Sequence, residues 1–297
     1  MSLINLENLT YYYPGQSHPA LHQVSFSIHS GESIGLLGHN GAGKTTLMSI
    51  ICGLQQPGSG YLKRQARLKL GLVPQSLAFY ARLSVAENLQ LFASLYQLKG
   101  SARKARLDNI IEQVNLAHKL NCPAAQLSGG EQRRLNFALG ILQPADLYLL
   151  DEATVGVDAA SRSTMLTVVE QLIREGAAII YTSHYLEEME RIASRILLLD
   201  SGRICLDLPQ DELRKGNHQL LLEWPDAVPQ AISAILIQHP NAIVLPRSVS
   251  FSPASSSDLL QLLTVLPTDQ HPSNISFGNP KLEQIYLATL SRNPEQE

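Results

Sequence analysis

The stretch GHNGAGKTT at residues 38–46 has the residue types and spacing of a phosphate-binding loop. It matches the pattern GxxxxGK[ST], in which glycines let the backbone turn its N–H groups inward around an anion. A helix expected directly after it would point its positive N-terminal end at the same anion. A chance glycine-rich turn is the alternative, and the apolar run that precedes the loop weighs against it. The residues expected to bind a nucleotide here are Gly38, His39, Asn40, Gly41, Ala42, Gly43, Lys44, Thr45 and Thr46.

Further groups would turn nucleotide binding into hydrolysis. Lys44 should reach the β and γ phosphates, and the Thr45 hydroxyl should ligate Mg²⁺. The run LYLLDE at residues 147–152 supplies carboxylates at a strand tip, where open α/β sheets bind ligands. Asp151 can hold the metal through water, and Glu152 can polarise the attacking water. Alone, such a run is often only a strand that leaves the core, but together with the phosphate loop it predicts a nucleotide hydrolase.

Alternating strands and helices are expected to position these groups. Continuous apolar runs predict strands buried on both faces at Ser33–Leu37, Leu70–Val73, Leu147–Asp151, Ala178–Thr182 and Ile196–Asp200. Alternating polar and apolar residues at Leu3–Leu9, Val24–Ile28 and Arg203–Leu206 predict a half-exposed antiparallel layer. Between Leu77 and Gln126 the apolar spacing becomes helical. We therefore expect an α/β fold with a largely parallel sheet, an antiparallel layer and an inserted helical subdomain at about 77–126.

The composition changes after Lys215. Residues 216–297 carry three Lys plus Arg against seven Asp plus Glu, which leaves 20 against 19 for residues 1–215. We expect a domain boundary there, with a small C-terminal α+β domain at 216–297. Its expected strands are Leu220–Trp224, Ala242–Leu245 and Ser248–Phe251, and its expected helices are Val228–Ile237, Asp258–Leu266 and Lys281–Leu290.

Composition and charge exclude several classes of protein. The 297 residues are 44% hydrophobic and carry a net charge of −3, which is far from the basic balance of nucleic-acid-binding proteins. The three cysteines, Cys52, Cys122 and Cys205, form neither a disulfide framework nor a metal-binding motif and fit a reducing cytoplasm. No apolar run approaches the roughly 18 residues that span a bilayer, so we expect no membrane crossing and no secretory signal.

The stretch LSGGEQRR at Leu127–Arg134 resembles the signature motif of ABC-transporter ATPase subunits. Other marks of that family follow in order: Tyr13 resembles the aromatic residue that stacks on adenine, Gln75 the Q-loop glutamine, Val155–Asp158 the D-loop and His184 the switch histidine. The resemblance covers residues 13–184 and implies a P-loop NTPase fold of the ABC type, with an ABC ATPase domain at 1–215. Tyr12 in place of Tyr13, a merely solvated Gln75 and a structural His184 are the alternatives. The resemblance implies that Glu152, His184 and Gln75 are the catalytic residues. It also implies that Thr45, Gln75 and Asp151 hold the metal, with Asp151 acting through water, and that Asp158 is the D-loop aspartate.

The signature residues Ser128, Gly129, Gly130 and Glu131 lie at an expected helix start and form a second anion nest. An ordinary helix cap is the alternative. In the family, this nest closes on the ATP of a partner subunit. The resemblance therefore implies a head-to-tail homodimer that traps two ATP molecules, and a heterodimer is also possible.

Two departures from the family pattern stand out. Ala153 and Ala159 replace prolines that stiffen the turn around the D-loop, so we expect looser communication between the two sites of a dimer. The stretch from Pro57 to Gln75 is about ten residues shorter than in the family, which should trim the antiparallel layer without touching the phosphates.

The resemblance implies an ATP- and Mg²⁺-dependent subunit that powers a separate transmembrane permease from the cytoplasmic face of the inner (plasma) membrane. Export is favoured for two reasons. The residues EQRR that follow the signature glycines are closer to the exporter-type sequence MKRR than to the QQQR of many importers, and LEQIYLATL at 282–290 is similar to a C-terminal motif of drug-exporter subunits. The alternative is a non-transport ABC ATPase, for example of the iron–sulfur assembly type, that acts with soluble partners. No nucleic-acid partner is expected.

Overall fold

The computed structural model describes residues 2–210, 219–229, 243–244, 246–251 and 272–278, and the chain falls into two units, 1–207 and 208–297. The first unit contains all the residues expected to bind a nucleotide. The expected domain boundary after Lys215 stays a prediction.

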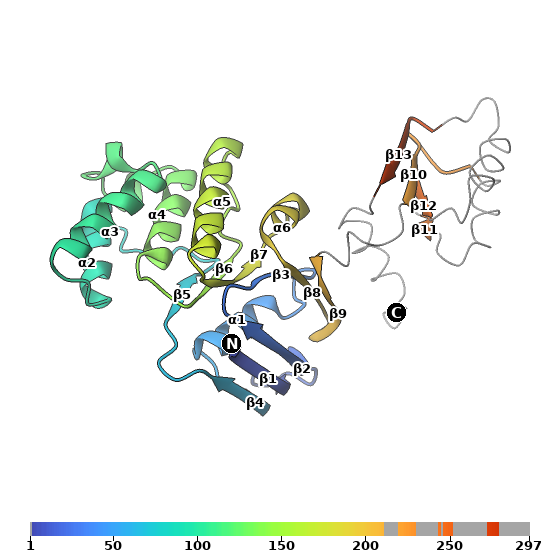
Figure 1. The fold of residues 1–297 in the computed structure, drawn as a ribbon, viewed down its shortest axis with the longest axis horizontal. Helices are drawn as coiled ribbons and strands as arrows, with labels where there is room; N and C mark the ends of the chain where they lie inside the picture. The colour runs from blue at the N-terminus through green and yellow to red at the C-terminus, as the bar shows by residue number, and fades with distance from the viewer. Residues whose placement is uncertain (1, 211–218, 230–242, 245, 252–271, 279–297) are drawn as a thin grey trace. The chain divides into compact units, whose positions relative to one another are not determined.

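A six-stranded sheet in the order β5-β6-β7-β3-β8-β9 forms the centre of the first unit (Figure 1). Its first five strands are parallel and match the apolar runs of the sequence, except that β8 begins one residue early. They are β3 (Ser33–Leu37), β5 (Leu70–Val73), β6 (Leu147–Asp151), β7 (Ala178–Thr182) and β8 (Arg195–Asp200). Every residue of β3, β6 and β7 is buried, because these strands are covered on both faces.

The antiparallel layer is a three-stranded sheet in the order β2-β1-β4. Its strands β1 (Ser2–Tyr11) and β2 (Leu21–His29) confirm and extend two of the expected alternating segments. The third strand, β4 (Ser59–Arg64), was not expected from the sequence. It is an edge strand with no buried residue, so it lacks the apolar alternation that marks a half-buried strand.

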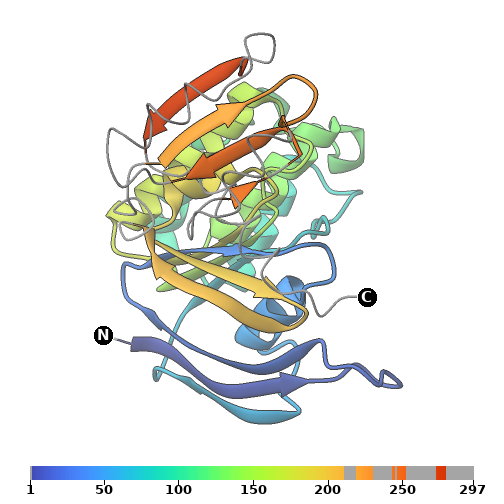
Figure 2. The same cartoon turned by 90° about the vertical axis from the view of Figure 1, so that its right-hand side faces the viewer.

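The expected place of residues 203–206 in the antiparallel layer is wrong. They belong to β9 (Arg203–Pro209), which lies beside β8 at the edge of the six-stranded sheet. Ser201 and Gly202 connect the two strands, and both have positive φ, as tight hairpin turns require. Because so short a turn forces the strands to pair with each other, β9 must extend the main sheet, as the hairpin in Figure 2 shows.

The main core lies between the two sheets and around helix α1 (Lys44–Cys52). Figure 1 shows α1 between the antiparallel layer and the six-stranded sheet. Its apolar face, Leu47, Met48, Ile50 and Ile51, is buried against side chains of β1, β2, β3, β6, β7 and β8. This packing fixes the start of α1, and with it the preceding phosphate loop, at the carboxyl end of β3.

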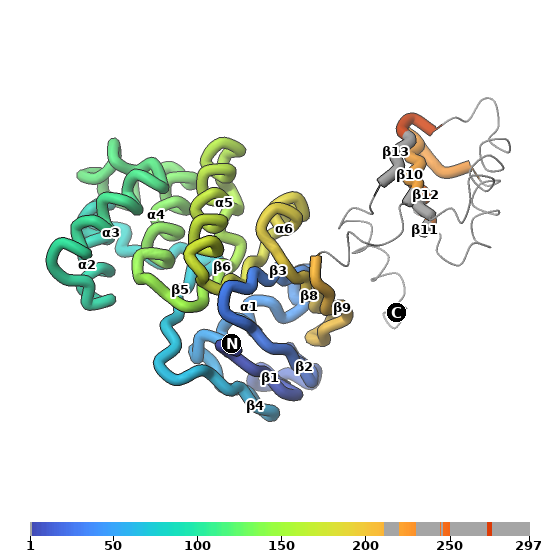
Figure 3. The backbone as a smooth tube through the Cα atoms, viewed as in Figure 1, coloured from blue at the N-terminus to red at the C-terminus, as the bar shows by residue number. Residues whose placement is uncertain are grey.

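The helical subdomain is present between β5 and β6, where Figure 3 traces the chain through α2, α3 and α4. Its elements are α2 (Val85–Leu95), α3 (Gly100–Gln113), two short 3₁₀ turns (Ala117–Lys119 and Ala124–Gln126) and α4 (Gly129–Ile141). Ser84 and Glu87 form a capping box that starts α2: the Glu87 N–H donates to the Ser84 hydroxyl, and the Ser84 N–H donates to the Glu87 carboxylate.

Helices α5 (Ala159–Arg174) and α6 (Leu186–Ile192) complete the first unit, after β6 and β7 respectively. Asp158 caps α5 by accepting the Ser161 N–H at 2.9 Å. Within the described ranges, none of the helices has both the length and the apolar character needed to cross a membrane.

The second unit contains an antiparallel sheet in the order β11-β12-β10-β13. Its strands are β10 (Gln219–Glu223), β11 (Ile243–Val244), β12 (Ser248–Phe251) and β13 (Asn274–Gly278). The strand expected at 248–251 is confirmed, the strand expected at 220–224 is confirmed with shifted ends, and the described part of 242–245, residues 243–244, is a strand. Strand β13 was missed. The expected helices at 258–266 and 281–290 lie outside the described residues, as does most of 228–237, whose Val228 and Pro229 are not helical.

Candidate functional site

The phosphate loop has a backbone shape that requires glycine at two positions. Gly38 has φ +155°, and a Cβ there would lie 2.3 Å from the Leu199 carbonyl oxygen. Gly43 has φ +107°, and a Cβ there would lie 2.5 Å from the Ala20 carbonyl oxygen. Since any side chain would collide with backbone at both positions, the loop depends on glycine to pass between β3 and α1.

Lys44 is the first residue of α1 and is folded back over the loop. Its ammonium group donates to the carbonyl oxygens of Gly38 at 2.7 Å and His39 at 3.0 Å. Burial lowers the pKa of Lys44 below its ordinary value, while the nearby carboxylates of Glu152 and Asp151 oppose that shift. The ammonium group is therefore held in the loop by neutral oxygens, within the field of two acidic side chains.

Asp151, the last residue of β6, joins the loop to the neighbouring strand. One carboxylate oxygen accepts from the Thr45 hydroxyl at 2.9 Å, and the other accepts from the Thr182 hydroxyl at 2.7 Å. The Thr182 hydroxyl also accepts the backbone N–H of Glu152 at 2.9 Å. Thr182 ends β7 in register with Asp151, so the parallel pairing of the two strands brings these groups together.

Glu152 follows directly and lies between two groups from other loops. Its Oε2 accepts from the Gln75 side-chain amide at 2.8 Å, and its Oε1 lies 2.8 Å from His184 Nε2. Its backbone has φ +49°, the left-handed region that a non-glycine residue adopts at a cost of about 1–3 kcal/mol. The structure thus brings together Gln75, Glu152 and His184, the residues expected to carry out catalysis.

A cavity of about 440 Å³ opens beside these groups. It is lined by Tyr13, Asn40, Gly41, Gly43, Lys44, Thr45, Thr46, Gln75 and Glu152 from the expected site, and by Gln16, His18, Pro19 and Ala20. The last four residues were missed, because nothing in their types distinguishes them from an ordinary turn. Tyr13, and not Tyr12, is in the lining, and its hydroxyl lies 3.0 Å from the Thr46 hydroxyl.

Other expected site residues do not line this cavity. The His39 ring contacts the Asn40 carbonyl oxygen at 2.7 Å and the Asp200 carboxylate at 3.0 Å, and Ala42, within the loop, is buried. The expected signature residues lie at the start of α4, where Ser128 and Glu131 form a second capping box. Gly129 is exposed, and a Cβ there would meet no atom within 4 Å. Gly129 is therefore open to solvent.

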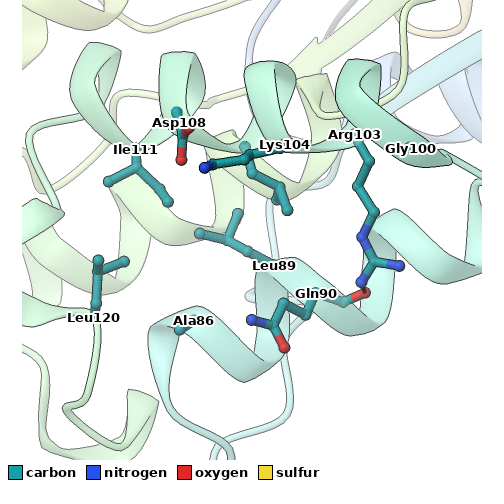
Figure 4. A pocket seen from close by; sticks show the side chains of 10 residues that line it. Ala86, Leu89, Gln90, Gly100, Arg103, Lys104, Asp108, Ile111 and Leu120 are labelled. Carbon is teal, nitrogen blue, oxygen red and sulfur yellow. Dashed lines mark hydrogen bonds between the residues drawn. The ribbon is translucent and has the colours of Figure 1, made fainter.

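A second cavity, of about 330 Å³, lies between α2 and α3 (Figure 4). Leu89, Ile111 and Leu120 contribute apolar surface to it, and Arg103 and Lys104 contribute charge. The Arg103 guanidinium donates to the Gln90 carbonyl oxygen at 3.0 Å. None of the residues expected to bind the nucleotide lines this cavity, so the candidate site is the cavity beside the phosphate loop.

The residues present fit Mg²⁺. Thr45 and Asp151 offer two hard oxygen donors 2.9 Å apart beside the loop, and Mg²⁺ is usually bound by one or two protein oxygens together with water and substrate phosphates. Across the described part of the chain, no group of three or more His, Cys, Asp or Glu side chains forms a metal site. A site completed by phosphate and water is the kind that these residues can form.

Comparisons with known proteins agree with this geometry. A family model described as "ABC transporter" matches residues 21–155. The linearmycin resistance ATP-binding protein of Bacillus subtilis is 32% identical over 91% of this chain and 93% of its own length. The doxorubicin resistance ATP-binding protein of Mycobacterium tuberculosis is 30% identical over 91% and 88%. A solved structure described as the ATP-binding subunit of an ABC transporter is 27% identical, with a TM-score of 0.66 over 72% of this chain and 92% of that chain.

Proposed function

The chain belongs to the ABC transporter family, and from that membership we propose that it powers export through a separate membrane-spanning permease. As an ATP-binding member of that family it is an ATP hydrolase, and its first unit has the ABC ATPase fold. The observation that supports the roles proposed below for single residues in ATP hydrolysis is the meeting of Gln75, Glu152 and His184 beside the cavity that Lys44 and Thr45 line.

ATP would lie in this cavity with its phosphates in the loop. The loop N–H groups and Lys44 would hold the β and γ phosphates, and the ring of Tyr13 would stack on adenine. Thr45 and Asp151 would hold Mg²⁺, with Asp151 acting through water and Gln75 as a further ligand. When bound, Mg²⁺ would neutralise charge on the phosphates.

Glu152 would accept a proton from the attacking water, because its carboxylate lies beside the phosphate loop and is held on both sides. Gln75 and His184 each contact one of its oxygens, so the carboxylate has a fixed orientation before substrate arrives. His184 is about half exposed and could turn from Glu152 toward a γ phosphate.

ATP would also join two subunits. The first turn of α4, with Ser128, Gly129, Gly130 and Glu131, would bind the γ phosphate of ATP held by a partner chain, with Asp158 close to the same interface. The exposure of Gly129 and its absence from the cavity lining support this assignment. A homodimer supplies two equivalent sites, and a heterodimer would satisfy the same contacts.

Export and the permease partner rest on the relatives. Two relatives that match 91% of the chain are named for resistance to linearmycin and doxorubicin, which points to the removal of a toxic compound. The helical subdomain would move the permease, and binding to the permease would hold the chain at the cytoplasmic face of the membrane. No observation favours the alternative of a non-transport ATPase that acts with soluble partners.

The proposal can be tested by affinity purification of tagged Glu152→Gln protein from detergent-solubilised native membranes with Mg²⁺ and ATP. This variant should bind ATP and stall before hydrolysis, and we expect a multi-spanning membrane protein to be recovered with it. Lys44→Ala, which should not bind ATP, shows whether recovery depends on the nucleotide. Recovery of soluble partners alone, from well-extracted membranes, would contradict the transporter assignment.

A further inference from the structure

A carboxylate that the proposed mechanism does not use lies at the centre of a buried polar cluster. Glu188, in α6, is 3% exposed. Both its oxygens accept from the Thr154 hydroxyl at 3.0 Å, and its Oε2 also accepts from the hydroxyls of Tyr181 at 2.7 Å and Ser183 at 2.5 Å. Arg162 Nε lies 3.6 Å from its Oε1 and supplies the opposite charge. We call these five residues the Glu188 cluster.

The cluster joins three segments that each carry a residue of the proposed site. Thr154 lies two residues after Glu152, and Ser183 lies directly before His184. Arg162 lies in α5, the helix that Asp158 caps. The Glu188 carboxylate therefore accepts hydrogen bonds from the turn after β6 and from the loop after β7, and it pairs with Arg162 near the start of α5.

Burial makes these contacts strong constraints. A buried carboxylate is costly without donors, so moving any one segment away would leave Glu188 partly unsatisfied. The strained backbone of Glu152 also needs neighbours that hold it in place. Ala153 and Ala159 lie where the family pattern has prolines, so this turn lacks two covalent restraints, and the bonds from Thr154 to Glu188 hold it at its centre.

We propose that Glu188 is a positioning residue for ATP hydrolysis, which holds Glu152 and His184 at their 2.8 Å contact. The inference rests on the proposed roles of those two residues. Glu188 itself reaches neither the cavity lining nor the phosphate loop, so its effect on hydrolysis passes through the segments it ties together.

The first test compares Glu188→Gln with Glu187→Gln. Glutamine keeps the size of Glu188 but replaces one acceptor oxygen with a donor and removes the charge that faces Arg162. We expect kcat for ATP hydrolysis to fall by about tenfold or more, with KM for ATP changed by less than about twofold. Glu187 is exposed on the same helix, so Glu187→Gln should match the wild type. Equal activity of the two variants would overturn the inference.

A smaller fraction of folded protein would also lower the measured rate of hydrolysis, so the folded fraction must be measured separately. The stoichiometry of ATP binding, measured on the same preparations, counts the molecules that are folded and competent. We expect full stoichiometry beside the lowered kcat. If Glu188→Gln does not fold, Thr154→Val removes one donor while keeping the side-chain shape, and it should lower kcat in the same way. A wild-type kcat for Thr154→Val would then overturn the inference.

A double-mutant cycle with His184→Ala, measured by single-turnover hydrolysis, tests whether Glu188 affects hydrolysis through the contact between Glu152 and His184. If Glu188 acts through the contact between Glu152 and His184, Glu188→Gln should cost less than about twofold once His184 is gone. An undiminished effect in that background would mean that Glu188 acts elsewhere. Glu152→Gln is measured in parallel. If this variant hydrolyses ATP at the normal rate, the proposed function of Glu152 is wrong. If Glu152→Gln is inactive but Glu188→Gln has normal activity, only the positioning role of Glu188 is wrong.

Discussion

At the scale of single residues, Thr182 shows how one hydroxyl can bind to two neighbouring acidic residues, one through its carboxylate and one through its backbone. It donates to Asp151 and accepts from the backbone N–H of Glu152, while it is itself fully buried. That N–H belongs to a residue with left-handed backbone that lies directly beyond the last residue of β6. The hydroxyl therefore satisfies a group that the shape of the site would otherwise leave unpaired.

We predict that Thr182→Val lowers both stability and hydrolysis. Valine preserves the shape but leaves the Glu152 N–H buried without an acceptor, which should reduce the free energy of unfolding by about 1–3 kcal/mol. Asp151 loses a donor at the same time, so kcat should fall by about tenfold. Urea denaturation and steady-state hydrolysis of ATP measure the two effects.

Thr10→Val is the matched control. The Thr10 hydroxyl also accepts a backbone N–H, that of Gln23 at 3.0 Å, and the side chain is largely buried in β1. This variant should lose stability in the same way and keep its kcat. Equal losses of kcat in the two variants would show that Thr182 acts only through stability.

At the scale of elements, the first turn of α4 combines a structural and a proposed binding role. Ser128 caps the helix by accepting the Glu131 N–H at 3.3 Å, and the Glu131 carboxylate accepts the Ser128 N–H at 2.8 Å. The Ser128 N–H holds the pKa of Glu131 below its usual value. Ordinary capping and anion binding are compatible here, because each uses different donors of the same turn.

We predict that Ser128→Arg prevents ATP-dependent dimerisation without preventing ATP binding by the single chain. The arginine would fill the surface that should receive the partner's γ phosphate. In the Glu152→Gln background, which should accumulate dimer, size-exclusion chromatography with Mg²⁺ and ATP measures the change. An unchanged amount of dimer would contradict the proposed contact between subunits.

Ser84→Arg is the control that separates the loss of dimerisation in Ser128→Arg from the loss of a helix cap. It breaks the matching capping box at the start of α2 and should cost about 1 kcal/mol of stability, as loss of the Ser128 cap should. Dimer formation should persist in Ser84→Arg, because α2 carries none of the expected signature residues.

At the scale of the whole molecule, the expected ATP-binding machinery lies within the first unit. Among the residues that the structure describes, those that form the cavity, the loop and the main core all come before residue 208. The second unit has a separate antiparallel sheet.

We therefore predict that a chain ending at Lys215 still binds ATP. Its affinity should lie within about threefold of the full chain, because every expected contact to the nucleotide is retained. Titration with a fluorescent ATP analogue measures this affinity, and circular dichroism checks the fold. A loss of about tenfold or more in a folded protein would mean that residues 216–297 contribute to the site, contrary to the predicted boundary.

The sequence alone was sufficient for features that depend on neighbours along the chain. The apolar runs predicted β3, β5, β6 and β7, and the glycine pattern predicted the loop between β3 and α1. Strand β4 was not predicted, because an exposed edge strand has few apolar residues. Strand β9 was assigned to the wrong sheet, because the alternation of polar and apolar residues does not show which strand lies beside it. The remaining expected helices of the second unit stay predictions.

Only the tertiary structure decided which distant residues meet. Gln75 reaches Glu152 across 77 positions of sequence, and Thr182 reaches Asp151 across 31. The Glu188 cluster likewise joins a turn, a loop and a helix whose residues look ordinary in isolation. Periodicity reports how one element faces the core, whereas the order of strands in a sheet follows from the packing of the whole chain, and that order determines which strand tips form the site.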